Sequence, residues 1–196
     1  DLHFYEVKAL HKDDEEIIIS RTGYTGEDGF ELYGSHKFII SQWDKLMASG
    51  RCKPCGLGCR DTLRFEVGLP LYGNELSVEI SPIMAGLGMF VKLEKTEFIG
   101  REALLRQKTE GVAKRLRGIE LDDNAIPRHG YNILQNGAII GQVTTGYRLI
   151  STNKSCAVAL VDASLKLGDR DQKENFPWNN RQEKILRKAL SSISIA

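Results

Sequence analysis

The organisation of the amino-terminal part of this chain depends on residues 20–32, which read SRTGYTGEDGFEL. Three glycines fall within residues 23–29 and indicate a loop, while alternating apolar residues on both sides indicate strands. The glycines permit positive φ values and let a ligand approach the backbone closely. The loop lacks the Lys-Ser/Thr of a phosphate-binding loop and the spacing of a dinucleotide-binding motif. These residues alone favour a long β-hairpin turn over a ligand-binding loop.

Outward from this loop, the sequence predicts a strand–strand–helix unit. Strands are expected over residues 4–10, 16–21 and 30–33, with a charged turn at 11–15. A helix is expected to begin after Ser35 as N-cap, to carry apolar residues at helical spacing through Met47, and to end at Gly50. An α+β sandwich is the natural packing for such a unit.

In the rest of the chain, the sequence pattern changes from one typical of helices and loops to one typical of short strands at about residues 108–113. Before this boundary we expect helices over 58–66 and 99–105, a loop over 70–75 and a strand over 89–94. After it, short strands are expected at 115–121, 132–134, 138–145 and 157–161. Asn136-Gly137 between apolar runs is a strong hairpin signal. We therefore predict an α+β chain with domains at 1–110 and 111–196, the second a small β-barrel or sandwich.

Composition excludes several classes of function. The chain has 196 residues, a charged content of 27% and a formal net charge of +1. This charge provides no electrostatic basis for binding nucleic acid or an anionic membrane. No run approaches the roughly 20 apolar residues of a spanning helix, and no targeting segment is visible. Because the chain opens on Asp1 and not on Met, we expect a fragment. The sequence does not reveal the organism, so a bacterial cytoplasm and a mitochondrial matrix both stay open as its location.

The cysteines do not form a convincing metal-binding pattern. Cys52, Cys55 and Cys59 follow a C-x2-C-x3-C spacing, and Cys156 lies far away. A structural zinc site usually needs four ligands, often as two close pairs, and no second pair is present. We expect small, partly buried thiols in a reducing compartment and predict no metal site.

Glu31, Arg60 and Arg64 are the polar residues whose placement suggests chemistry. By strand alternation, Glu31 faces away from Phe30 and Leu32, where its carboxylate could accept two hydrogen bonds from a heterocycle or simply face solvent. Arg60 and Arg64 share one helix face, and Asp61 can offset their repulsion. For this pair, an ion-pair network and an anion site remain equally open.

Five blocks of sequence, in order, resemble the glycine cleavage system T-protein family. They are SRTGYTGEDGFEL at 20–32, GLGCRDTLRFE at 56–66, LYGNEL at 71–76, FIGREAL at 98–104 and GQVTTG at 141–146. Cys59 replaces a small alanine of the family pattern. The resemblance covers about residues 1–168, whereas the polar segment 170–196 departs from it. A truncated or frame-altered gene would explain both ends.

The resemblance implies a fold and an activity. The fold would be a ferredoxin-like-type α/β portion of a folate-binding domain, followed by a small antiparallel β-barrel. The family transfers the one-carbon unit of an aminomethyl group from the lipoyl arm of H-protein to tetrahydrofolate, and ammonia is released. Glu31 falls on the pterin-contacting glutamate, Tyr24 on a tyrosine of the folate cavity and Arg60 on an arginine of the same site. Arg128 falls where the family contacts acidic residues of H-protein.

The same resemblance places the catalytic aspartate upstream of Asp1, so no catalytic residue is predicted in this chain. We expect an apolar surface that the missing half would cover, and homodimerisation or poor solubility as the result. Two functions follow from this. One is an aminomethyltransferase, or part of one, and the other is a folate-binding, catalytically incomplete fragment or vestigial relative.

Overall fold

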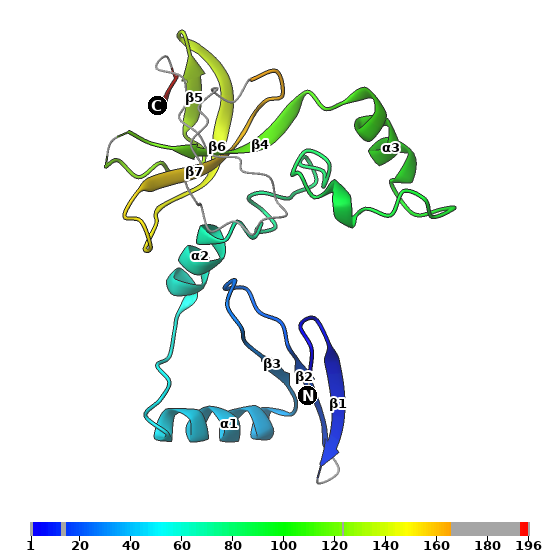
Figure 1. The fold of residues 1–196 in the computed structure, drawn as a ribbon, viewed down its shortest axis with the longest axis vertical. Coiled ribbons are helices and arrows are strands. Elements are labelled where there is room, and N and C mark those ends of the chain that lie inside the picture. Colours follow the sequence, from blue (N-terminus) through cyan, green and yellow to red (C-terminus); the bar gives the residue numbers. More distant parts are fainter. Residues whose placement is uncertain (1, 13–14, 123, 166–192, 196) are drawn as a thin grey trace. The chain divides into compact units, whose positions relative to one another are not determined.

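The computed structural model describes residues 2–12, 15–122, 124–165 and 193–195. The chain divides into two compact units, residues 1–67 and 68–196, which are described separately below (Figure 1). The domain boundary expected near residues 108–113 stays a prediction. Among the described residues, no helix combines the length and the apolar character needed to cross a membrane.

The first unit contains a three-stranded antiparallel sheet with the order β1-β2-β3. Its strands are β1 (Val7–Lys12), β2 (Glu15–Ser20) and β3 (Glu31–Tyr33). The expected strands are confirmed, but part of the expected turn is wrong, because β1 continues to Lys12. In the ladder Lys12 faces Glu15 and His11 faces Glu16. Backbone pairing therefore continues through residues that resemble a charged turn.

Two helices complete the first unit, α1 (His36–Ala48) and α2 (Leu57–Glu66). The Ser35 hydroxyl accepts a hydrogen bond from the Phe38 amide at 3.2 Å, which confirms the predicted N-cap. Gly50 takes a positive φ of 66° just beyond α1, as its role in ending the helix requires. The second helix begins at Leu57, one residue before the expected start.

The second unit is built on a five-stranded antiparallel sheet with the order β4-β7-β6-β5-β8 (Figure 1). Its elements in chain order are a 3-10 turn η1 (Gly88–Phe90), α3 (Arg101–Glu110), β4 (Lys114–Glu120), β5 (Asn132–Gln135), β6 (Ala138–Arg148), β7 (Ser155–Asp162) and β8 (Ile193–Ile195). Asn136 and Gly137 both have positive φ and connect β5 to β6, which confirms the predicted hairpin. The hydrophobic core lies on one face of the sheet and is formed by Ile119, Ile133, Val143, Ala157, Ala159 and Val161.

Three expectations for the second unit are wrong. The strand expected over 89–94 is the turn η1 followed by irregular backbone, where Met89 and Phe90 are exposed. An apolar run forms a strand only beside a partner edge, and this run has none among the described pairings. The helix expected over 99–105 begins at Arg101 and continues to Glu110. The strand expected over 138–145 continues through Gly146 to Arg148.

The described strands form antiparallel sheets in an α+β chain, and none of their pairings closes β4 onto β8 into a barrel. Residues 193–195 of the divergent tail pair with β5 as strand β8. The remainder of the tail, residues 170–192 and 196, lies outside the described residues.

Candidate folate-facing site

The glycine loop of the first unit is closed at its base by a two-point ion pair. Arg21 Nε and Nη2 donate to the two carboxylate oxygens of Asp28 at 2.9 and 3.0 Å, and Arg21 Nη1 donates to the Leu2 carbonyl at 2.8 Å. The hydrogen bond from Arg21 lowers the pKa of Asp28, and the same bond raises the pKa of Arg21. Bidentate pairing fixes orientation as well as distance, so the loop has a defined shape.

The tip of the loop packs against the end of α2. Gly26 has a positive φ of 78°, and a Cβ at this position would lie only 3.0 Å from Val67 Cβ and would overlap Val67 Cγ1. Only glycine meets both requirements, the unusual φ and the close approach. The sequence suggested glycines for ligand access, and at Gly26 the structure shows that packing of the loop against the helix is the reason.

Tyr24 and Arg60 contact each other. The guanidinium carbon of Arg60, on the first turn of α2, lies 4.5 Å from the centroid of the Tyr24 ring in the loop. This distance is typical of a cation–π interaction. Two residues predicted separately to face one ligand are therefore brought together. The pair presents an aromatic face and a planar cation, both suited to a flat heterocycle that carries carboxylates.

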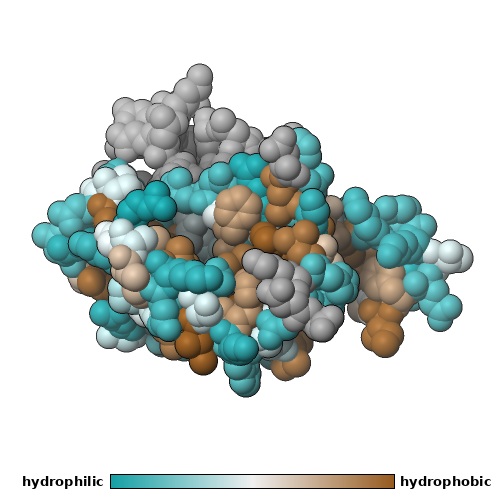
Figure 2. Space-filling model, turned by 90° about the horizontal axis from the view of Figure 1, so that it is seen from below, coloured by the Kyte–Doolittle hydropathy of each residue, from teal (hydrophilic) through white to brown (hydrophobic). Residues whose placement is uncertain are grey.

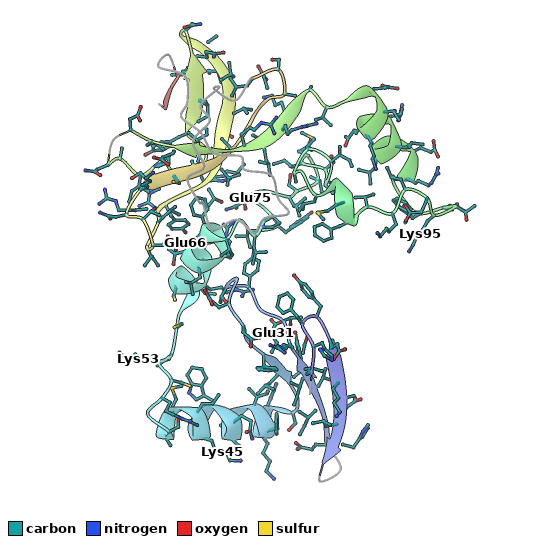
Figure 3. All side chains as sticks on the ribbon, viewed as in Figure 1. Glu31, Lys45, Lys53, Glu66, Glu75 and Lys95 are labelled. Atoms are coloured by element: carbon teal, nitrogen blue, oxygen red, sulfur yellow. The ribbon has the colours of Figure 1, made fainter. Side chains whose placement is uncertain are left out.

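Glu31 lies on β3, opposite Ser20 in the ladder, and is exposed (Figure 3). Its carboxylate accepts a short hydrogen bond from the Thr22 hydroxyl, which in turn lies 2.9 Å from Ser20 Oγ. Thr22 therefore orients the carboxylate from the loop that carries Tyr24. A carboxylate offers about four acceptor positions, so Glu31 can accept further hydrogen bonds. Its contact with a pterin stays a prediction.

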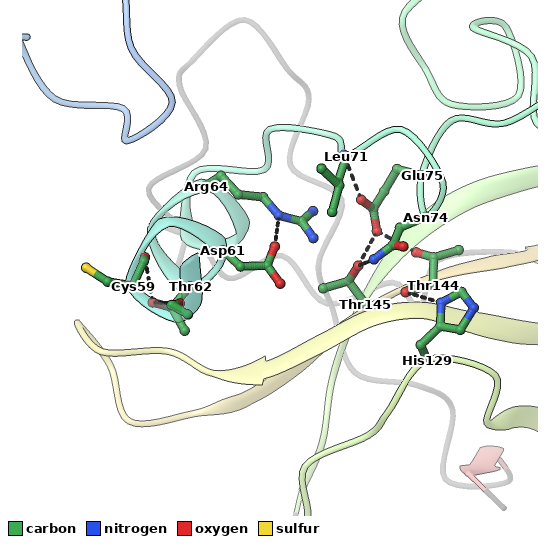
Figure 4. A network of polar contacts seen from close by, with 11 residues as sticks. Cys59, Asp61, Thr62, Arg64, Leu71, Asn74, Glu75, His129, Thr144 and Thr145 are labelled. Atoms are coloured by element: carbon green, nitrogen blue, oxygen red, sulfur yellow. Dashed lines mark hydrogen bonds and ion pairs between the residues drawn. The ribbon is translucent and has the colours of Figure 1, made fainter. Parts of the chain in front are cut away.

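The position of Arg64 decides, for this arginine, between the ion-pair network and the anion site that the sequence left open. Its side chain is only 1% exposed, and its Nε donates to Asp61 at 2.5 Å (Figure 4). Arg64 thus belongs to the ion-pair alternative, with the partner that the sequence suggested. Arg60 is exposed and stacks on Tyr24, so it is the arginine of the two that can meet a ligand.

A buried carboxylate in the second unit was not predicted. Glu75 is 3% exposed and accepts hydrogen bonds from the Leu71 amide at 3.0 Å, from Thr144 Oγ1 at 2.8 Å and from Thr145 Oγ1 at 2.6 Å (Figure 4). Asn74 Nδ2 also donates to Thr145 Oγ1 at 3.0 Å. These bonds fasten the loop around residues 71–75 to β6. No local signal distinguishes Glu75 from an exposed glutamate, since the two threonines that bind it lie about 70 residues away.

The remaining candidates are the thiols and Arg128. Cys52 and Cys55 are exposed, Cys59 is half-buried and Cys156 is buried, and none of the four takes part in a disulfide among the described residues. Among the described residues, no group of three or more His, Cys, Asp or Glu side chains is placed to hold a metal ion. Arg128 is exposed in the loop between β4 and β5, where its carbonyl accepts a hydrogen bond from the Tyr131 amide at 3.1 Å.

The fold and the site define an α+β protein in which the exposed carboxylate of Glu31 and the Tyr24–Arg60 pair lie on or beside the glycine loop. The Arg21–Asp28 ion pair holds this loop closed, and it is called the clamped glycine loop below. Two family models match the chain: "GCVT N-terminal domain" over residues 1–95 and "Glycine cleavage T-protein C-terminal barrel domain" over residues 114–175. The chain belongs to the glycine cleavage T-protein family. This confirms the family that the five sequence blocks indicated.

Curated relatives and a solved structure agree with this family. An aminomethyltransferase of Lysinibacillus sphaericus is 54% identical over 151 residues, which are 76% of this chain and 41% of that protein. One from Clostridium botulinum is 47% identical over 83% of this chain and 45% of its own length. The crystal structure of glycine cleavage system aminomethyltransferase T from Bartonella henselae has 32% identity and a TM-score of 0.74, covering 82% of this chain and 45% of that one. The chain thus spans less than half the length of these relatives.

Proposed function

We propose that this chain forms the carboxy-terminal, folate-facing part of an aminomethyltransferase of the glycine cleavage system. The reaction moves the one-carbon unit from the aminomethylated lipoyl arm of H-protein to tetrahydrofolate and releases ammonia. Family membership and the names of the relatives support this activity. In the same proposal, residues 1–110 contribute the ferredoxin-like-type portion of the folate-binding domain, and the sheet of residues 111–196 is the family's small barrel.

The observation that carries the proposal is the contact between Tyr24 and Arg60 beside the clamped glycine loop. In this assignment Tyr24 forms a wall of the folate cavity and Arg60 supplies a positive charge. Glu31 accepts hydrogen bonds from ring N–H groups of the pterin, while Thr22 holds its carboxylate in place. Tetrahydrofolate is the one-carbon acceptor substrate, and none of these three residues is assigned a step in the chemistry.

Two protein partners are part of the proposal. Arg128, exposed in its loop, pairs with acidic residues of lipoylated H-protein.

The second partner is another copy of this chain, because the first unit exposes many large apolar residues, and no residue of α1 is buried. Figure 2 shows apolar side chains in brown among the hydrophilic surface. We expect concentration-dependent self-association in sedimentation velocity, and a clean monomer that binds no apolar dye would oppose this part of the proposal.

Calorimetric titration of the folded chain with tetrahydrofolate tests the binding assignment. Glu31→Ala removes a charged acceptor, and a hydrogen bond to a charged group contributes about 1.5–3 kcal/mol, so affinity should fall roughly 10- to 150-fold. Glu27→Ala is the matched control, because Glu27 is an exposed carboxylate of the same loop. Normal affinity in the Glu31→Ala variant would refute the pterin contact, and a folded parent chain that binds no tetrahydrofolate would refute folate binding altogether.

A turnover assay separates the two functions left open by the sequence. Chain that binds tetrahydrofolate is mixed with lipoylated, aminomethylated H-protein, and formation of 5,10-methylenetetrahydrofolate is followed. Turnover supports an active aminomethyltransferase, whereas binding without turnover supports the catalytically incomplete alternative. The second outcome is favoured for this chain alone, because the relatives are more than twice as long as the region that they share with it.

A further inference from the structure

Two arginines of the edge strand β4 lie on the face of the second unit's sheet that carries its hydrophobic core. In the ladder between β4 and β7, Arg115 lies opposite Val161. Two residues further along β4, Arg117 lies opposite Ala159. Both opposing residues are fully buried members of the core. Since residues directly opposite each other in an antiparallel ladder share a face, the two arginines continue the row that begins with the core residue Ile119.

No carboxylate of the β4–β7 ladder balances these two positive charges. The ladder contains two acidic residues, Glu120 and Asp162, which occupy the alternate positions and therefore point to the opposite face. Within the part of the chain that the structure describes, neither Arg115 nor Arg117 forms an ion pair. Their one side-chain hydrogen bond there runs from Arg117 Nη1 to the Leu116 carbonyl at 3.4 Å.

The two guanidinium groups are partly removed from water and near each other. Both arginines are half-buried, and Arg115 Nε is buried without a hydrogen-bond partner among the residues described. A strand rises about 3.3 Å per residue, so the two Cα atoms lie about 7 Å apart and both long side chains can reach one ligand. Burial lowers the pKa of Arg117, and the neighbouring charge of Arg115 adds to this effect. Such cations are costly to bury unless an anion compensates them.

We propose that Arg115 and Arg117 form a binding site for a phosphate dianion, which is held between their two guanidinium groups. Each guanidinium presents a planar fork of N–H donors. A phosphate group has enough terminal oxygens to accept hydrogen bonds from both forks, and its two negative charges balance the two arginines. A single carboxylate has only two oxygens, which one fork can occupy. Inorganic phosphate and phosphate monoesters share this chemistry.

The backbone that carries the two arginines is held on both sides. On one side it pairs with β7, and on the other the Leu116 amide donates to the Met84 carbonyl at 3.0 Å. Leu116 lies between the two arginines in the sequence, so this bond fixes the strand at the site itself. A backbone that is already fixed loses little further freedom when a ligand binds, which favours affinity.

NMR titration of the full chain with inorganic phosphate tests the site, with the arginine Nε–H signals as the readout. At mildly alkaline pH and constant ionic strength, the signals of Arg115 and Arg117 should shift and saturate. Arg115→Met and Arg117→Met keep an apolar stem but remove the charged fork, so each should weaken binding about tenfold or more. Arg106→Met is the matched control, because Arg106 is an exposed arginine of α3, and it should leave the affinity unchanged.

Arg117→Lys keeps the charge and loses the fork, so it should also weaken phosphate binding, and it serves as the test if a methionine variant does not fold. Glycerol 3-phosphate, titrated in parallel, distinguishes an organic phosphate from the free ion by its higher affinity. Absence of saturation, or equal shifts with sodium chloride, would overturn the proposal. Equally tight binding of the dicarboxylate glutarate would refute the choice of phosphate. No folate enters these titrations, so their result is independent of the proposed function.

Discussion

Removal of the Glu75 carboxylate should destabilise the second unit strongly. In Glu75→Ala, the Thr144 hydroxyl can still donate to the Val158 carbonyl at 3.0 Å. The Leu71 amide and the Thr145 hydroxyl lose the acceptor that they share in the native protein. A hydrogen bond to a charged group contributes about 1.5–3 kcal/mol, so the loss of these two bonds predicts a decrease of about 3–6 kcal/mol in the free energy of unfolding.

Hydrogen exchange followed by mass spectrometry, together with urea denaturation, measures this loss. Faster exchange is expected in peptides covering β6, because Glu75 fastens residues 144 and 145 of that strand to the preceding loop. The control is Glu79→Ala, since Glu79 is an exposed glutamate four residues further on. A Thr145→Val variant completes a double-mutant cycle, for which we expect a coupling energy above about 0.5 kcal/mol. If Glu75→Ala unfolds within about 0.5 kcal/mol of the control, the network does not support the fold as reasoned here.

Two further predictions concern the loop and the glycines. Because the hydrogen bond from Arg21 lowers the pKa of Asp28, its contribution to loop stability should be present above the ordinary Asp pKa of about 3.9 and lost as pH falls through the lowered value. NMR titration of the Asp28 carboxyl group should show this lowered pKa. An Asp28 pKa at the ordinary value would contradict the Arg21–Asp28 ion pair. Gly146→Ala should destabilise by about 1–3 kcal/mol in urea denaturation, since a Cβ there overlaps the Pro127 carbonyl. Gly58→Ala on α2 meets open space and should stabilise by about 0.4–1 kcal/mol; equal effects of the two substitutions would contradict the packing argument.

Local rules predicted those parts of the fold whose stabilising contacts are close in sequence. The Ser35 cap, the helix that follows it and the Asn136-Gly137 hairpin all depend on residues within a few positions of one another. The same rules failed for residues 89–94, where strand formation needed a partner edge that none of the described strand pairings provides. They also missed the extension of β1, because residues 11 and 12 pair with residues 15 and 16 across the hairpin instead of forming the turn.

By itself, the sequence determined the family and the α+β class, because long motif blocks and local periodicity are readable without coordinates. It also led to the prediction that Tyr24, Glu31 and Arg60 contact the folate. Only the tertiary structure decided which arginine is internal and which is available. Helical spacing alone treats Arg60 and Arg64 alike, yet in the structure Arg60 stacks on Tyr24 and Arg64 is buried against Asp61. It also revealed the buried Glu75, whose threonine partners are about 70 residues away. Burial and such distant hydrogen bonds arise only when separate segments pack together, and no local pattern encodes them.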